Sequence, residues 1–170
     1  MRMARFKYLM WQFVVKGLLG LISFGLTAEG LRLVIPSSAQ RISKLPFLGS
    51  FDGYEGWHRL SLAHILALLL VVSCFLLWTM VLESWLTPGE AEAEGFDPER
   101  LRRVMVPLAV VILGGDGFLF YCGISAGGWS GSAVSGSALI ATTVYAALVI
   151  LTCLVSVILK QKMLSYGRDP

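Results

Sequence analysis

The sequence lacks most of the features that common soluble functions require. Only 15% of its 170 residues are charged, and its three cysteines occur in no CxxC spacing. An odd number of cysteines within apolar stretches is not a disulfide framework, so we expect Cys74, Cys122 and Cys153 to be buried small apolar side chains. The net charge of +3 is scattered over chain ends and loops. It forms no basic patch with interleaved aromatic residues, which argues against a nucleic-acid partner.

Catalytic and cofactor motifs are also lacking. The chain contains no P-loop, no GxGxxG and no HExxH pattern. Its only histidines, His58 and His64, fall on one predicted helix, whereas a haem held between helices commonly needs histidines that face each other. We therefore expect no enzyme, no metal site and no cofactor, with lipids as the bound small molecules.

What the chain has in abundance is apolar residues. They make up 56% of the sequence, against about 45–50% in ordinary soluble domains. Four stretches, about 8–35, 58–84, 104–125 and 138–159, are each long enough to cross a bilayer core about 30 Å thick. The sequence predicts an all-α fold, a single membrane domain (1–170) that forms an integral membrane bundle of four transmembrane helices.

Local signals set the expected helix ends. Pro36 should end the first helix because proline cannot continue the backbone hydrogen bonds. Asp97 as N-cap followed by Pro98 should start the third helix, after an acidic linker at 86–97. The run Gly114-Gly115-Asp116-Gly117 is expected to interrupt the third span, and Ser137 is expected to cap the fourth.

The distribution of Lys and Arg predicts the orientation of the bundle. Nine basic residues lie near one set of helix ends and three near the other. Since the more basic side is normally cytoplasmic, we expect an N-in/C-in topology with a cytoplasmic 86–97 linker, in a bacterial inner (cytoplasmic) membrane. The nine residues are Arg2, Arg5, Lys7, Arg100, Arg102, Arg103, Lys160, Lys162 and Arg168, and the three are Arg41, Lys44 and Arg59.

Polar side chains inside the spans are the candidate functional residues. Glu29 and Asp116 each lie thirteen residues beyond a basic residue at the predicted cytoplasmic surface, a rise of roughly 20 Å. His64 lies seven residues in from the opposite surface, roughly 10 Å deep. These depths coincide and predict one polar layer in the outer third of the membrane. The candidate intramembrane polar cluster is Glu29, Arg32, His64, Asp116 and Tyr145.

Three interpretations of this layer remain open. Its members can be neutralised locally: Glu29 by Arg32 at i,i+3, His64 by a backbone carbonyl or Ser61, and Asp116 by freed N–H groups of its own helix. They can instead form a proton or cation pathway. A metal site is the least supported, because its ligands would come from separate helices with no local spacing signature.

Small and hydroxyl residues form stripes that predict helix contacts, because small residues let membrane helices approach closely. Gly20, Ser23 and Thr27 are the predicted helix-packing residues of the first span. We expect the chain to be a small multi-pass structural or accessory subunit that self-associates or packs against other membrane proteins and lipids. The alternative is a small proton- or cation-coupled channel or transporter. The full stripes are Gln12, Lys16, Gly20, Ser23, Thr27 and Gly30, and Ala138, Thr142, Tyr145, Val149, Thr152 and Ser156.

Overall fold

The fold of the chain is helical in a computed structural model that describes residues 2–39, 61–93, 95, 97–126 and 132–165. No strand occurs in these ranges. The elements in chain order are α1 (Arg2–Met10), the π-helical segment η1 (Trp11–Lys16), α2 (Gly17–Val34), the 3₁₀ turn η2 (Pro36–Ala39), α3 (Leu62–Leu86), α4 (Pro88–Ala93), α5 (Pro98–Ala126) and α6 (Ser132–Ser165).

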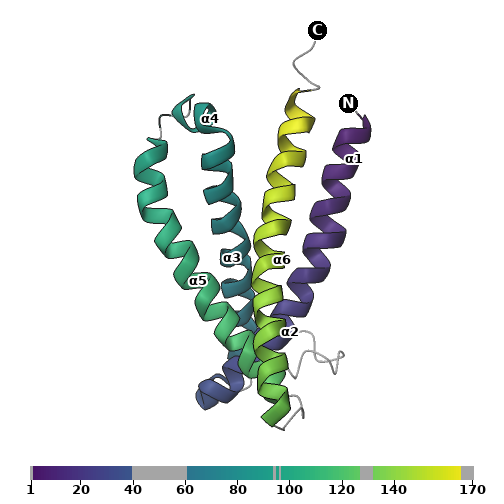
Figure 1. Cartoon of the computed structure of the whole chain (residues 1–170), viewed down its shortest axis with the longest axis vertical. Helices are drawn as coiled ribbons and strands as arrows, with labels where there is room; N and C mark the ends of the chain where they lie inside the picture. Colours follow the sequence, from purple (N-terminus) through teal and green to yellow (C-terminus); the bar gives the residue numbers. More distant parts are fainter. Residues whose placement is uncertain (1, 40–60, 94, 96, 127–131, 166–170) are drawn as a thin grey trace, which may run out of the picture.

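Four helices of the described chain are long and apolar enough to span a membrane. They cover Met3–Val34, Leu62–Leu86, Pro98–Ser125 and Gly136–Ser165, and the first of them combines α1, η1 and α2. Figure 1 shows that α1 begins and α6 ends at the same end of the molecule as α4. The all-helical fold with four apolar helices is therefore the one that the sequence predicts.

The first span crosses the bundle diagonally. Its N-terminal part, α1, packs against α6, whereas α2 packs most closely against α5 and also contacts α3. In Figure 1, α1 and α5 lie on opposite sides of the bundle at the α4 end, and α2 and α5 meet near the other end. Helix α3 contacts α2, α5 and α6, and α5 likewise contacts α2, α3 and α6.

Two glycines allow α2 and α5 to touch through their backbones. A Cβ built on Gly30 would lie 1.9 Å from the carbonyl oxygen of Leu119, and one on Gly123 would lie 2.0 Å from that of Leu26. No side chain fits at such distances, so only glycine permits this crossing.

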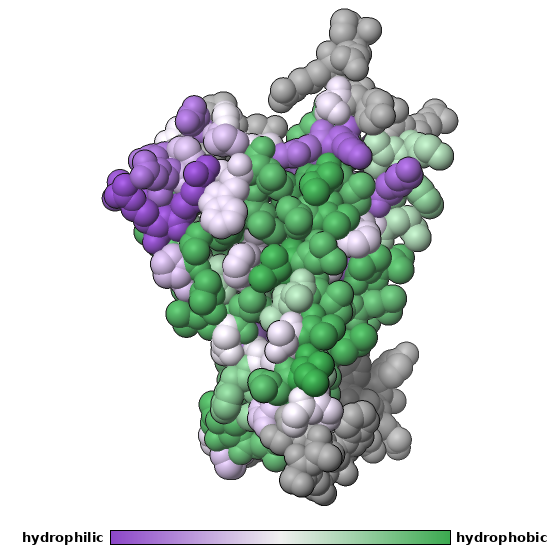
Figure 2. Space-filling model, viewed as in Figure 1, coloured by the Kyte–Doolittle hydropathy of each residue, from purple (hydrophilic) through white to green (hydrophobic). Residues whose placement is uncertain are grey.

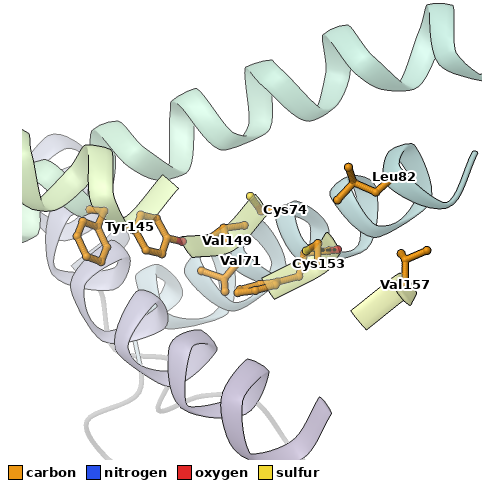
Figure 3. Packing of buried hydrophobic residues seen from close by; sticks show 9 residues of the cluster. Val71, Cys74, Leu82, Tyr145, Val149, Cys153 and Val157 are labelled. Atoms are coloured by element: carbon orange, nitrogen blue, oxygen red, sulfur yellow. Dashed lines mark hydrogen bonds between the residues drawn. The ribbon is translucent and has the colours of Figure 1, made fainter. Parts of the chain in front are cut away.

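The apolar core lies between α3, α5 and α6. Figure 3 shows part of it, with Tyr145 at one end of the cluster and Val157 at the other. Cys74 and Cys153 are fully buried within it, while Cys122 is half-buried, and all three are free thiols. The burial expected for Cys74 and Cys153 is thus confirmed.

The outside of the bundle is apolar along the spans. Figure 2 shows a hydrophobic surface over the middle of one face and hydrophilic residues gathered at the end that carries α4. Large apolar side chains are exposed on every span, for example Leu21, Leu69, Val111 and Ile140. In water such a surface would be a liability, so it fits a chain whose middle is surrounded by lipid.

Several predicted helix ends can be compared with the structure. Asp97 caps α5, because its Oδ1 accepts the backbone N–H of Glu99 at 2.9 Å, as the sequence predicted. The expected interruption at 114–117 is wrong, since α5 continues through the glycines without a break. The predicted start of the last helix at Ser137 is also wrong: α6 begins at Ser132. The acidic linker contains the short helix α4, which the sequence analysis did not predict.

Candidate functional site

Asp116 on α5 lies at the centre of a buried cluster of polar side chains in the described bundle. Its side chain has no exposed surface. Thr27 on α2 donates a hydrogen bond to its Oδ1 at 2.8 Å, and the Tyr145 hydroxyl on α6 hydrogen-bonds its Oδ2. One carboxylate therefore connects three of the four spans.

A neighbour of Asp116 on α5 packs against one of its two partners, Tyr145. The ring of Tyr145 stacks on Phe120, one turn after Asp116, with ring centroids 4.1 Å apart and planes 4° from parallel. A Cβ on Gly117 would lie 3.6 Å from the side chain of Thr142 on α6, an ordinary van der Waals distance, so α5 and α6 are packed together here. The glycine-rich sequence around Asp116 leaves the helix intact.

A third hydroxyl extends this group toward the start of α2. Ser23 is fully buried and donates to the carbonyl of Leu19 at 2.6 Å. Ser23 also lies close to the Tyr145 hydroxyl. Asp116, Thr27, Tyr145 and Ser23 therefore form one buried polar cluster, in which Asp116 bonds Thr27 and Tyr145 while Ser23 bonds its own helix.

Glu29 and Arg32 lie apart from this cluster. They form an ion pair with each other, with Nη1 and Oε1 at 2.9 Å, and their side chains are 54% and 42% exposed. The pair is the local i,i+3 contact, one of the interpretations that the sequence left open. Neither residue has a contact with Asp116 in the described structure.

His64 has a structural role at the start of α3. Its Nδ1 accepts the backbone N–H of Ser61 at 3.2 Å and lies 2.8 Å from the Ser61 hydroxyl. The bond from the Ser61 N–H to the His64 side chain is one half of a capping box, and the imidazole ring lies 5.8 Å from the ring of Phe24 on α2. The predicted partnership of His64 with Asp116 does not occur in the described structure.

The structure thus assembles only part of the predicted layer. It joins Asp116 and Tyr145, leaves Glu29 with Arg32 and places His64 with Ser61. The sequence predicts Thr27 as a packing residue and does not predict its bond to Asp116. The Thr27 hydroxyl on the small-residue stripe indicates a possible hydrogen-bond donor. The sequence does not give the rotation of α2 relative to α5, so the partner of this donor could not be derived.

The predicted packing residues of the first span are in different environments. Ser23 and Thr27 have no exposed surface. Gly20 is half-buried, and a Cβ there would meet nothing within 4 Å. The close approach on this helix occurs at Gly30 instead.

The π-helical segment η1 contributes a second set of interhelical contacts that the sequence analysis did not predict. Trp11 Nε1 donates to the carbonyl of Thr152 at 3.0 Å, and Gln12 donates to the Ser156 hydroxyl. Lys16 Nζ donates to the Thr79 hydroxyl at 3.3 Å. Such π-helical turns often occur at functional positions, and this one directs three polar side chains toward α6 and α3.

No cluster of three or more His, Cys, Asp or Glu side chains that could hold a metal ion occurs within the described ranges. Comparisons of the chain with models of known families, with curated proteins and with solved structures find no match.

Proposed function

We propose that the chain is a small multi-pass integral membrane protein that acts as a structural or accessory subunit of a homo- or hetero-oligomeric complex. One observation carries the proposal. Gly114 and Gly115 lie on an exposed face of α5, and a Cβ at either position would meet nothing within 4 Å. The same face presents Val111 and Phe118, which are 69% and 56% exposed.

Glycine in the middle of a helix is unfavourable unless something uses the space it leaves. It costs about 1 kcal/mol relative to alanine, and lipid does not compensate for that cost. A second helix does, because small residues let two backbones approach closely within a membrane. Gly30 and Gly123 are used in this way inside the chain. The Gly114–Gly115 face supports a corresponding contact with a helix of another copy or another membrane protein.

The proposal includes a location and an orientation. The nine basic residues near one set of helix ends support a cytoplasmic position for both termini and for α4. We place the protein in a bacterial inner membrane, with lipids and membrane proteins as its partners and with no enzyme activity, cofactor or nucleic-acid partner.

Native gel electrophoresis of membranes containing the full chain tests this function. We expect the wild type to migrate as a complex larger than one chain, and the Gly115→Leu variant to migrate closer to the monomer. Photobleaching of labelled chains in vesicles then counts the copies and separates self-association from a mixed complex. The matched control is Val144→Leu on α6, since Val144 is 51% exposed and away from the glycine face.

The result can contradict the proposal in two ways. A wild type that migrates as a single chain in native membranes has no subunit function. A complex that is unaffected by leucine at both Gly114 and Gly115 does not form through this face. Because neither glycine has a neighbour within 4 Å, the leucine variants are expected to keep the fold.

A further inference from the structure

Asp116 is chemically unusual among the acidic residues of this chain. Among the acidic side chains whose burial the structure describes, it is the only one with no exposure; the rest are half-buried or exposed, namely Glu29, Glu83, Glu92, Asp97 and Glu99. It lies inside a membrane-spanning helix. Ionisable groups in such positions commonly mark proton or ion sites, because keeping them there is costly.

The groups that face Asp116 are all neutral hydrogen-bonding groups. Helix α2 contributes the hydroxyls of Thr27 and, through Tyr145, Ser23; α6 contributes Tyr145; and α3 contributes the thiol of Cys74. No described basic side chain neutralises Asp116. The two basic side chains of η1 and α2 contact other groups: Arg32 pairs with Glu29, and Lys16 binds Thr79.

These hydroxyls satisfy the ionised carboxylate. Thr27 donates to Oδ1 and Tyr145 donates to Oδ2, while Ser23 donates to the Leu19 carbonyl. Hydrogen bonds to a carboxylate favour its charged form. The ionised acid is therefore held by two donors but has no counter-charge.

The same atoms also satisfy the neutral acid. With a proton on Oδ2, Asp116 donates to the Tyr145 oxygen, and the Tyr145 O–H turns toward Ser23, which continues to donate to the Leu19 carbonyl at 2.6 Å. Thr27 still donates to Oδ1. Hydroxyl protons rotate freely, so the two patterns differ chiefly in the positions of protons.

We propose that Asp116 is a reversible proton-binding site in the interior of the bundle, with Tyr145 and Ser23 as the hydroxyls that turn to match its protonation state. A proton taken from water forms the Oδ2–H bond, and its release returns it to water. The ligand is a proton and not a metal cation, because Asp116 is fully buried and its oxygens bond directly to the hydroxyls. This inference does not depend on the subunit function proposed above.

Infrared difference spectroscopy of the full chain in lipid, recorded between acidic and alkaline pH, tests the site. We expect the wild type to show the C=O band of a buried carboxylic acid that disappears on alkalisation and returns on acidification. Asp116→Asn should lack this band, and Tyr145→Phe should shift it to higher frequency, since the acid then loses its acceptor. The control Glu29→Gln should leave it unchanged, because Glu29 is exposed and paired with Arg32.

The proposal is wrong if the folded wild type has no pH-dependent carboxylic acid band, or if Asp116→Asn retains it. Should Asp116→Asn fail to fold, the Tyr145→Phe variant decides the assignment, and an unshifted band there overturns it. Association is not measured in this experiment, so its outcome is independent of the native-gel result.

Discussion

Gly30 on α2 faces the backbone carbonyl of Leu119 on α5 so closely that a Cβ would lie 1.9 Å from the oxygen. The contact is reciprocal, because Gly123 faces the carbonyl of Leu26 in the same way. Each glycine comes four residues after the leucine of its own helix. The crossing also brings Thr27, next to Leu26, to Asp116. The glycine contact and the buried carboxylate are therefore parts of one helix junction.

Gly30→Ala should destabilise the bundle. The new methyl group overlaps backbone, which cannot move aside without separating the helices, and overpacking of this kind costs about 1–3 kcal/mol. Gly20→Ala is the matched control on the same helix, since its Cβ meets nothing within 4 Å and alanine is the better helix former. Unfolding of the reconstituted chain by a denaturing detergent measures both. Equal stabilities would contradict the assigned crossing.

Gly123→Ala should destabilise the bundle to a similar extent, and the two alanines together should cost less than their sum. Once the first alanine has pushed α2 and α5 apart, the second meets less resistance, so residues sharing one contact are not additive. The unfolding free energies of the two single variants and the double variant check this. Strict additivity would mean that the two contacts are independent.

Glu29→Gln should change the unfolding free energy by less than about 1 kcal/mol. An exposed i,i+3 ion pair contributes only a few tenths of a kcal/mol, and the Glu29 side chain is 54% exposed. The same detergent unfolding assay measures the effect. A loss of several kcal/mol would show that Glu29 has a buried role that the structure does not contain.

A cysteine placed at Glu92 tests the proposed orientation. Glu92 is exposed on α4, so it should react with an impermeant thiol reagent only after the cells are made permeable. The fully buried Cys74 and Cys153 should not react, and Cys122→Ser removes the half-buried thiol from the background. Labelling of Glu92→Cys in intact cells would contradict the proposed topology and favour the opposite one.

Features set by neighbouring residues could be predicted from the sequence. Asp97 caps α5 by accepting the backbone N–H of Glu99, only two residues away. The number of long apolar helices follows from the length and hydropathy of each stretch. Tyr145 was a candidate beside Asp116 because a helix has a constant rise per residue, so depth can be counted along it. These are properties of one segment at a time.

Features that depend on two segments could not be derived in this way. His64 and Glu29 share an estimated depth with Asp116, but depth does not give the rotation of a helix, and both side chains contact other groups. In the sequence, Gly30 does not differ from Gly20 on the same stripe. Only the position of α5 shows that Gly30 makes the close contact. The π-helical turn η1, with the sequence WQFVVK, carries no proline or glycine that would mark it in the sequence.

Asp116 and Tyr145 hold α5 and α6 together inside the bundle, and a double-mutant cycle tests this contact most directly. Asp116→Asn, Tyr145→Phe and the double variant are compared by detergent unfolding, with Thr143→Val as the control partner, because Thr143 is exposed and bonds only its own helix, at Leu139. We predict a coupling of about 0.5–2 kcal/mol between Asp116 and Tyr145, and additivity between Asp116 and Thr143. A coupling of zero between Asp116 and Tyr145 would contradict the account.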